Sequence, residues 1–190
     1  MLPGCRRRNN IIHTARLTLR PLAEEDLDFL LSLWNDPEIM RYAGGILNWS
    51  RPHIIDWFGK QPRLHPSFPD DLFPEETHLI ICLRDGRRIG ESGIGKLPPG
   101  WACEGFRVPF GKNAGICDVK LARDFWGAGY GTEAMVAVVD YFRHGTSLDV
   151  LVVPPHRDNH AAIRVYEKAG FRMTKGIAWE VHLIMVMEKR

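Results

Sequence analysis

The sequence predicts an α/β fold, α+β-like in arrangement, with a mixed, mostly antiparallel central sheet of six to seven strands flanked by about four helices. Three observations predict it. Apolar and polar residues alternate in short runs of the first half, as they do in half-buried strands. An Asp-Gly pair at 85–86 separates two such runs and indicates a hairpin. A glycine-rich turn joins an apolar run to an amphipathic helix in the second half, and this succession of strands and helices is typical of mixed folds.

The first half begins with one strand and two helices. Residues 15–20 alternate as a strand does. A helix is expected from Ala23, because acidic residues suit its N-terminus and apolar residues then recur at i, i+3, i+4 and i+7. Asp36 and Pro37 end that helix, since proline cannot continue it. Ser50 is expected to cap a second short helix, which has a proline in its first turn.

A long loop and a hairpin follow. Residues 59–76 contain four prolines and little periodicity, which predicts either a loop that binds substrate or closes over it, or an insertion without such a role. The runs at 77–83 and 88–94 are expected to pair antiparallel across the turn at 84–87. Another extended run is expected near 104–108.

The second half alternates strands and helices. An extended run at 115–122 leads to the glycine-rich turn at 126–132. This turn opens a helix whose apolar residues fall on one face. The remaining expected elements are a strand at 147–153, a helix at about 159–169 ended by Gly170, and a closing strand at 178–188.

Composition indicates a single globular domain. Of 190 residues, 45% are hydrophobic and 25% charged, which suits one packed core over 15–190 with a flexible tail at 1–14. The formal net charge is +2, so we expect neither a nucleic acid nor a membrane as partner. The four cysteines are widely spaced and lack metal-ligand spacing, so no metal is expected. The absence of a recognisable signal peptide or membrane span in the sequence favours the cytoplasm.

The glycine-rich turn is a candidate phosphate site. Glycines at alternate positions, Gly127, Gly129 and Gly131, precede a helix, where free backbone N-H groups and the helix dipole attract anions. The alternative is a tight turn that needs glycine for conformational reasons alone. A P-loop is excluded because no lysine follows the last glycine. A dinucleotide fingerprint matches weakly, and too few residues follow for a second nucleotide-binding half.

Two segments carry a family resemblance. DVKLARDFWGAGYGTEA, from Asp118 to Ala134, resembles motif A of the GNAT superfamily of acetyltransferases. NHAAIRVYEKAGF, from Asn159 to Phe171, resembles motif B of the same superfamily. The opening at 15–22 is similar to the branch of ribosomal-protein N-terminal acetyltransferases. One position departs from the usual motif A: Trp126 replaces arginine or glutamine, which removes a polar side chain from the phosphate site.

The resemblance implies a GNAT-type acyl-CoA N-acyltransferase fold and acetyl-CoA as co-substrate. It implies direct transfer of the acetyl group to an amine without an acyl-enzyme, so no nucleophilic cysteine is required. The residues it places at the cofactor are Val119, Lys120, Leu121, Trp126, Gly127, Ala128, Gly129, Tyr130, Gly131, Thr132, Asn159 and Tyr166. Asn159 is also expected to cap the last helix.

The candidate catalytic residues are Tyr166, Glu104 and Asp118. A phenol stays protonated near neutral pH, so Tyr166 can donate a proton to the departing thiolate; the alternative is a core aromatic. Glu104 and Asp118 lie on strands expected beside the site, and either is a candidate general base. Strand register decides which face of the sheet each side chain takes. Two alternatives therefore stay open: either carboxylate is only a solvated strand residue, or a bound water acts as the base.

The expected function is an acetyl-CoA-dependent N-acetyltransferase acting on a primary amine, either a peptide N-terminus or a small amine such as a polyamine or aminoglycoside. The acceptor would be set by the first helices and the loop at 59–76. The alternatives are a non-catalytic module of the same fold that binds acyl-CoA or a partner, and a nicotinamide dinucleotide-binding domain. A homodimer is conceivable through exposed antiparallel strand edges.

Overall fold

The computed structural model describes residues 11–60 and 76–189 of the chain. The strands are β1 Ile12–His13, β2 Leu17–Pro21, β3 Glu76–Leu83, β4 Arg88–Lys96, β5 Ala102–Cys103, β6 Phe106–Arg107, β7 Ala114–Cys117, β8 Lys120–Leu121, β9 Val150–Val153, β10 Arg172–Ala178 and β11 His182–Glu188. The helices are α1 Leu27–Trp34, α2 Pro37–Met40, α3 Arg51–Lys60, α4 Tyr130–Gly145 and α5 His160–Lys168, with 3-10 turns at Glu24–Asp26 and Arg123–Phe125.

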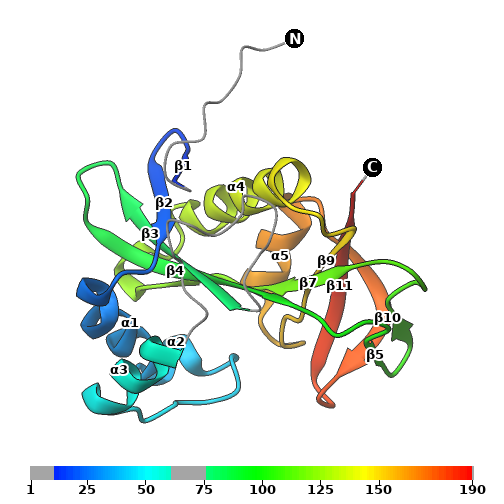
Figure 1. Ribbon diagram of the computed structural model, residues 1–190, viewed down its shortest axis with the longest axis horizontal. Coiled ribbons are helices and arrows are strands. Elements are labelled where there is room, and N and C mark those ends of the chain that lie inside the picture. Colours follow the sequence, from blue (N-terminus) through cyan, green and yellow to red (C-terminus); the bar gives the residue numbers. More distant parts are fainter. Residues whose placement is uncertain (1–10, 61–75, 190) are drawn as a thin grey trace.

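One sheet runs through the molecule in the order β1-β2-β3-β4-β7-β9-β11-β10, with β8 paired to β4 (Figure 1). Neighbouring strands in this sheet are antiparallel, except for the parallel pair β7 and β9. The β5–β6 hairpin forms a separate small sheet. The predicted mixed, mostly antiparallel fold is confirmed. The described part of the main sheet has nine strands where six to seven were expected. The two-residue strands β1 and β8 are too short to give a sequence pattern, and β10 was not expected.

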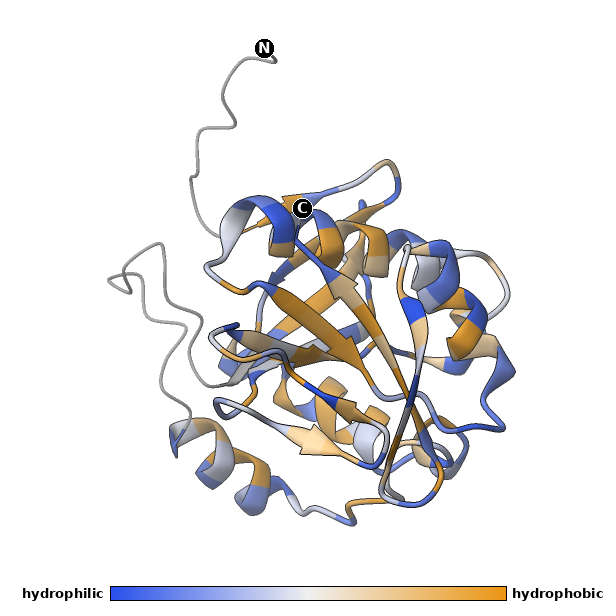
Figure 2. Ribbon diagram, turned by 90° about the vertical axis from the view of Figure 1, so that its right-hand side faces the viewer, coloured by the Kyte–Doolittle hydropathy of each residue, from blue (hydrophilic) through white to orange (hydrophobic). Residues whose placement is uncertain are grey.

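The two faces of the sheet are covered by different helices. Along β3, Leu79 and Ile81 contribute to the core beneath α4 and α5, whereas Ile80 and Cys82 contribute to the core beneath α1 and α3. This follows from the alternation of side chains along a strand. The strands in the centre of Figure 2 are accordingly coloured as apolar over much of their length, while the surrounding helices carry hydrophilic residues on their outer sides. Both faces are therefore buried.

Four predicted elements need correction. The expected tail at 1–14 overlaps β1, whose two residues pair with β2. The run at 115–122 is divided into β7 and β8. The single closing strand at 178–188 is wrong, because Trp179 and Glu180 form a turn with positive φ between β10 and β11. The extended run at 104–108 is interrupted by Gly105, which joins β5 to β6.

The other predicted elements agree with the structure. The hairpin at 77–94 is β3 and β4, and Gly86 has the positive φ of +88° that its turn requires. Ser50 precedes α3, and its hydroxyl accepts a hydrogen bond from the backbone of His53 at 3.4 Å. The expected loop at 59–76 falls largely at 61–75, outside the described residues.

Beyond the parallel pairing, the sheet opens. β7 pairs with β9 only from Ala114 to Ile116. After Cys117 the chain continues as β8, which pairs with β4 through Lys120 and Leu121. The segment after β9 begins with two prolines and turns toward α5. The strands therefore separate at the middle of the sheet, and this separation opens the cavity described below.

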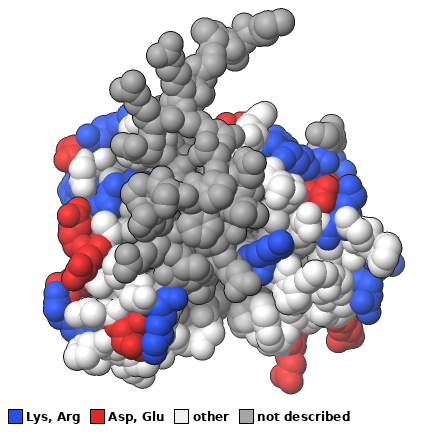
Figure 3. Space-filling view, viewed as in Figure 1, with Lys and Arg blue, Asp and Glu red and all other residues white. Residues whose placement is uncertain are grey.

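Charges of both signs are distributed over the described surface. Figure 3 shows Lys and Arg side chains beside Asp and Glu side chains at both sides of the face in view. Within residues 11–60 and 76–189, no helix is both long enough and apolar enough to span a membrane.

Candidate active site

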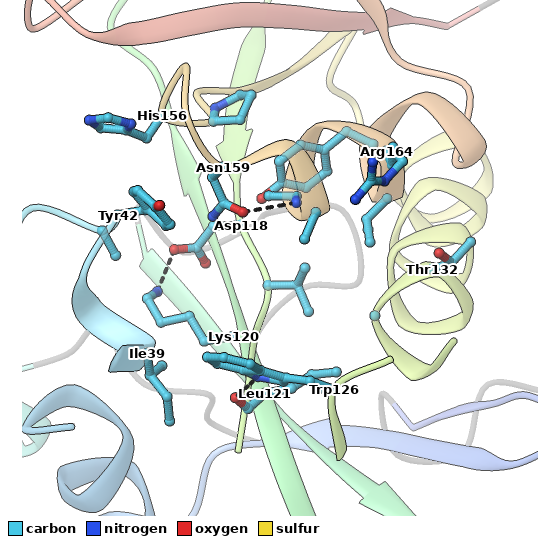
Figure 4. A pocket seen from close by; sticks show the side chains of 18 of the residues that line it. Ile39, Tyr42, Asp118, Lys120, Leu121, Trp126, Thr132, His156, Asn159 and Arg164 are labelled. Carbon is cyan, nitrogen blue, oxygen red and sulfur yellow. Dashed lines mark hydrogen bonds and ion pairs between the residues drawn. The ribbon is translucent and has the colours of Figure 1, made fainter. Parts of the chain in front are cut away.

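A cavity of about 810 Å³ lies where β7–β8 and β9 separate. One wall is the chain from Asp118 to Leu121, and the opposite wall is α5 with the segment that precedes it (Figure 4). The glycine-rich turn and the start of α4 close one end. The segment after α2 and the turn between β10 and β11 contribute to the other end. The cavity thus collects residues from both halves of the chain.

The glycine-rich turn has the conformation that its glycines predict. Gly127 and Gly129 have φ values of +76° and +84°, which side chains other than glycine rarely adopt. Gly129 is the N-cap of α4, and no side chain caps this helix end. The first N-H groups of α4 therefore lack helical partners and are available to an anion at the positive end of the helix dipole. This arrangement fits a pyrophosphate.

A positive charge beside this turn comes from a residue that the sequence analysis did not single out. Arg16 donates from Nη1 to the carbonyl of Ala128 at 3.0 Å and from Nε to Glu133 at 2.6 Å. Its guanidinium also lies over the ring of Tyr130, 4.4 Å from the centroid. The segment before β2 thereby places a cation, paired with Glu133, beside the glycine-rich turn.

The strand wall carries the next predicted positions. Val119, Lys120 and Leu121 all line the cavity. Trp126 lines it too, and its Nε1 donates a hydrogen bond to the carbonyl of Leu121 at 2.7 Å. Trp126 therefore ties the glycine-rich turn to β8 instead of offering a polar group to a phosphate.

A chain of charged groups connects this wall to the sheet interior. Lys120 donates from Nζ to Asp118, at the cavity, and to the fully buried Glu91 at 3.0 Å. Glu91 also accepts hydrogen bonds from Trp34 Nε1, at 3.2 Å, and contacts His78 Nδ1 at 3.3 Å. Burial raises the pKa of Glu91, but the charge of Lys120 and the contact with His78 outweigh burial and lower it below its usual value. Glu91 thus stays anionic and anchors Lys120.

Asp118 is held at the point where β7 ends. Its Oδ1 accepts a hydrogen bond from the backbone of Gly93 at 3.0 Å, and its side chain is 40% exposed. Its backbone carbonyl accepts a hydrogen bond from Ser92. The carboxylate is therefore fixed in position but open to the cavity, as a proton acceptor requires.

Tyr166 lies in the opposite wall, on α5. Its side chain is buried yet lines the cavity. Burial raises the pKa of the Tyr166 phenol well above its usual value of 10, and the negative charge of Asp118 raises it further. A hydrogen bond from the backbone of Val119 partly offsets this increase. The hydroxyl therefore holds its proton at neutral pH and can act only as a proton donor there.

Asn159 caps α5, as predicted: its Oδ1 accepts a hydrogen bond from the backbone of Ala162 at 3.0 Å. It also lines the cavity, so it serves the helix and the site together. Arg164 and Lys168, on the same helix, line the cavity as well. Figure 4 shows Arg164 at the same side of the cavity as Thr132, near the start of α4. These two cations were not predicted, because nothing in the sequence says which face of α5 meets the cavity.

Two predicted site residues do not line the cavity. Ala128 lies in the glycine-rich turn, and its carbonyl is taken by Arg16. Glu104 is exposed and forms an isolated bridge with Ile177 of β10, so strand register has carried it away from the site. Eleven of the twelve predicted cofactor positions do line it: Val119, Lys120, Leu121, Trp126, Gly127, Gly129, Tyr130, Gly131, Thr132, Asn159 and Tyr166.

Comparison with known proteins identifies the family. A family model described as an acetyltransferase (GNAT) domain matches residues 16–172. The chain belongs to the GNAT acetyltransferase family. It is 27% identical over 181 residues to an uncharacterized protein, YkkB, of Bacillus subtilis, covering 93% of this chain and 94% of that one. It is 29% identical over 162 residues to the aminoglycoside N(6')-acetyltransferase type 1 of Klebsiella pneumoniae, covering 82% and 73%.

A solved structure supports the fold of this GNAT acetyltransferase. The spermidine N-acetyltransferase of Vibrio cholerae, in complex with CoA and spermine, superposes with a TM-score of 0.71 at 17% identity and covers 93% of this chain and 97% of that one. The chain is thus an N-acetyltransferase whose co-substrate is acetyl-CoA, as the sequence predicted. The narrower likeness to ribosomal-protein N-terminal acetyltransferases is not what these relatives show, since their names refer to aminoglycoside and spermidine enzymes.

The sheet topology excludes the alternative of a nicotinamide dinucleotide-binding domain. A dinucleotide-binding domain needs a largely parallel sheet, whereas β7 and β9 form the parallel pair of a mostly antiparallel sheet here. In the described part of the chain, no group of three or more His, Cys, Asp or Glu side chains is arranged to hold a metal ion.

Proposed function

We propose that this GNAT acetyltransferase moves an acetyl group directly from acetyl-CoA to a primary amine, either a peptide N-terminus or a small amine, with Tyr166 as general acid and Asp118 as general base. One observation carries the proposal: a protonated phenol, an exposed carboxylate and an uncapped helix N-terminus face the same cavity. When bound, acetyl-CoA supplies the thioester that reacts with the amine.

The cofactor end of the cavity is suited to the polyanionic part of CoA. The free N-H groups at the start of α4 and the turn at Gly127 and Gly129 are proposed to bind the pyrophosphate. Arg164 and Lys168 add positive charge in the same cavity. Val119 lies in the open part of the sheet, where its backbone carbonyl is proposed to pair with the amide-bearing arm, since its N-H is directed to Tyr166.

The reaction needs one proton removed and one supplied. An amine attacks only in its neutral form, so Asp118, directly or through a water molecule, is proposed to accept the ammonium proton. The Tyr166 hydroxyl is proposed to protonate the leaving sulfur as the C–N bond forms and the C–S bond breaks. Glu104 is not part of this proposal, because it lies outside the cavity.

The experiment is a thiol-release assay with acetyl-CoA and a panel of primary amines, on wild type and Tyr166→Phe. The variant keeps the ring and removes the proton, so kcat should fall by about 10²-fold while the KM for acetyl-CoA changes little. An unchanged kcat would overturn the role of Tyr166. If the protein binds CoA but releases no CoA thiol from acetyl-CoA with any of the amines, the alternative of a non-catalytic acyl-CoA-binding module would be favoured.

A further inference from the structure

The charges of the cavity are unevenly distributed. Of the described residues that line it, Asp118 is the only carboxylate, whereas Lys120, Arg164 and Lys168 are cationic. Lys120 is already paired with Asp118 and Glu91. Arg164 and Lys168 are proposed to serve the CoA end, so an acceptor with several ammonium groups would find a single carboxylate among the described lining residues. A single ammonium group matches it better.

The end of the cavity away from the glycine-rich turn is lined by aromatic rings. Tyr42 follows α2, His156 follows β9, Trp179 lies in the turn between β10 and β11, and His182 begins β11. The ring centroids of Tyr42 and His156 are 5.1 Å apart, those of His156 and His182 5.4 Å, and those of Trp179 and His182 5.5 Å. Four rings thus form one continuous wall.

This aromatic wall lies beside the proposed base. Figure 4 shows Tyr42 and His156 on the side of Asp118 opposite to Thr132, which marks the start of α4. An amine held at Asp118 would therefore extend its body toward the rings and away from the cofactor end. The wall is in the place where an acceptor must lie.

Two features distinguish the wall from an ordinary core cluster. Trp179 is 62% exposed and has a φ of +47°, a backbone conformation that costs energy for a bulky residue. Nδ1 of His182 is buried and has no hydrogen-bond partner among the described residues. Burial lowers the pKa of His182 and the neighbouring His156 lowers it further, so this imidazole is neutral at neutral pH. His182 therefore presents an uncharged ring to the wall.

We infer that the acceptor is a small primary monoamine bearing an aromatic ring, with its amine at Asp118 and its ring against Tyr42, His156, Trp179 and His182. The inference rests on the proposed function and narrows its acceptor class. Contact between aromatic rings adds to the affinity that burial gives, so the wall distinguishes a ring from an alkyl chain of similar length.

The first experiment compares four acceptors with the full chain and acetyl-CoA: phenethylamine, n-butylamine, spermidine and a tripeptide with a free N-terminus. The expected result is a kcat/KM for phenethylamine at least about tenfold above the other three values. A higher value for spermidine or for the peptide would overturn the inference but leave the proposed function standing. No thiol release with any of the amines would instead count against the proposed function.

The second experiment measures the ratio of kcat/KM for phenethylamine to that for n-butylamine in Trp179→Ala and Tyr42→Ala. Loss of one aromatic contact should lower this ratio about 2- to 10-fold. Phe110→Ala is the matched control, because Phe110 is fully exposed and does not line the cavity. A ratio unchanged in both cavity variants would show that the wall does not select the acceptor. Equal unfolding midpoints of the variants and wild type would verify that each protein is folded.

Discussion

The guanidinium of Arg16, just before β2, donates from Nε to Oε2 of Glu133, in the first turn of α4, at 2.6 Å. Glu133 accepts two further hydrogen bonds from the same segment, from the Thr14 hydroxyl at 2.5 Å and from the backbone N-H of Arg16 at 2.8 Å. Residues more than a hundred positions apart thus fix the entrance to the helix that is proposed to bind pyrophosphate. This relationship leads to the first prediction.

Arg16→Ala should weaken CoA binding about 2- to 10-fold, because it removes a cation and a brace from the turn. The range is modest since the Arg16 side chain is 47% exposed and water screens its charge. Isothermal titration with CoA measures the effect. Arg51→Ala is the matched control, because Arg51 forms an exposed pair with Asp28 on other elements. An unchanged dissociation constant in Arg16→Ala would show that the backbone alone holds the turn.

Gly127→Ala should weaken CoA binding and also destabilise the fold by about 1 kcal/mol. A Cβ at Gly127 would meet no atom within 4 Å, so the cost comes from the positive φ and not from a clash. Gly86→Ala is a close control, since Gly86 also has a positive φ and open space around it but lies in the β3–β4 hairpin. Both variants should lose similar stability in urea unfolding. If both also lose CoA affinity equally, the turn has no specific role.

Asp118→Asn should lower kcat/KM by about 10²-fold near pH 7, where a general base is needed. The deficit should shrink as the pH rises toward about 10, because an alkylamine acceptor then supplies its own neutral form. The measurement is a pH profile of thiol release for wild type and variant. A deficit that stays constant across this range would indicate that Asp118 positions the acceptor and does not accept its proton.

Asp26→Asn should lower the free energy of unfolding by about 2 kcal/mol at pH 7. Asp26 is fully buried and accepts hydrogen bonds from Arg20 at 2.6 Å and from Arg88 at 2.6 Å. This loss is smaller than the about 3 to 5 kcal/mol that is typical of breaking a fully buried ion pair, because both arginines remain partly exposed.

The pH dependence of Asp26 has a defined sign. Burial raises the pKa of Asp26, but hydrogen bonds from Arg20, the backbone of Ala23 and Arg88 outweigh it and lower the pKa below its usual 3.8. The stabilising contribution is therefore complete above 3.8 and is lost as the pH falls through the lower folded value. Urea unfolding of both proteins from pH 7 to pH 2.5 should show the difference shrinking below pH 3.8. A constant difference would contradict an electrostatic origin.

The sequence alone determined the fold class and the conformation of the glycine-rich turn. The glycines at 127 and 129 and the period of the following helix are local features, and local backbone physics gives them a defined turn and helix start. The same holds for Asn159, whose capping role depends on residues within one helical turn.

Only the tertiary structure decided which distant side chains share the cavity. Tyr42, His156 and Trp179 come from three separate segments and line it together, and Arg16, from the other end of the chain, braces the glycine-rich turn at its edge. Glu104 and Asp118 were equivalent candidates in the sequence, but strand pairing directs Asp118 to the cavity and leaves Glu104 against Ile177. A shift of one residue in register reverses the face of a strand side chain. Contacts of this kind depend on how strands pair across the whole chain, and no local pattern contains that information.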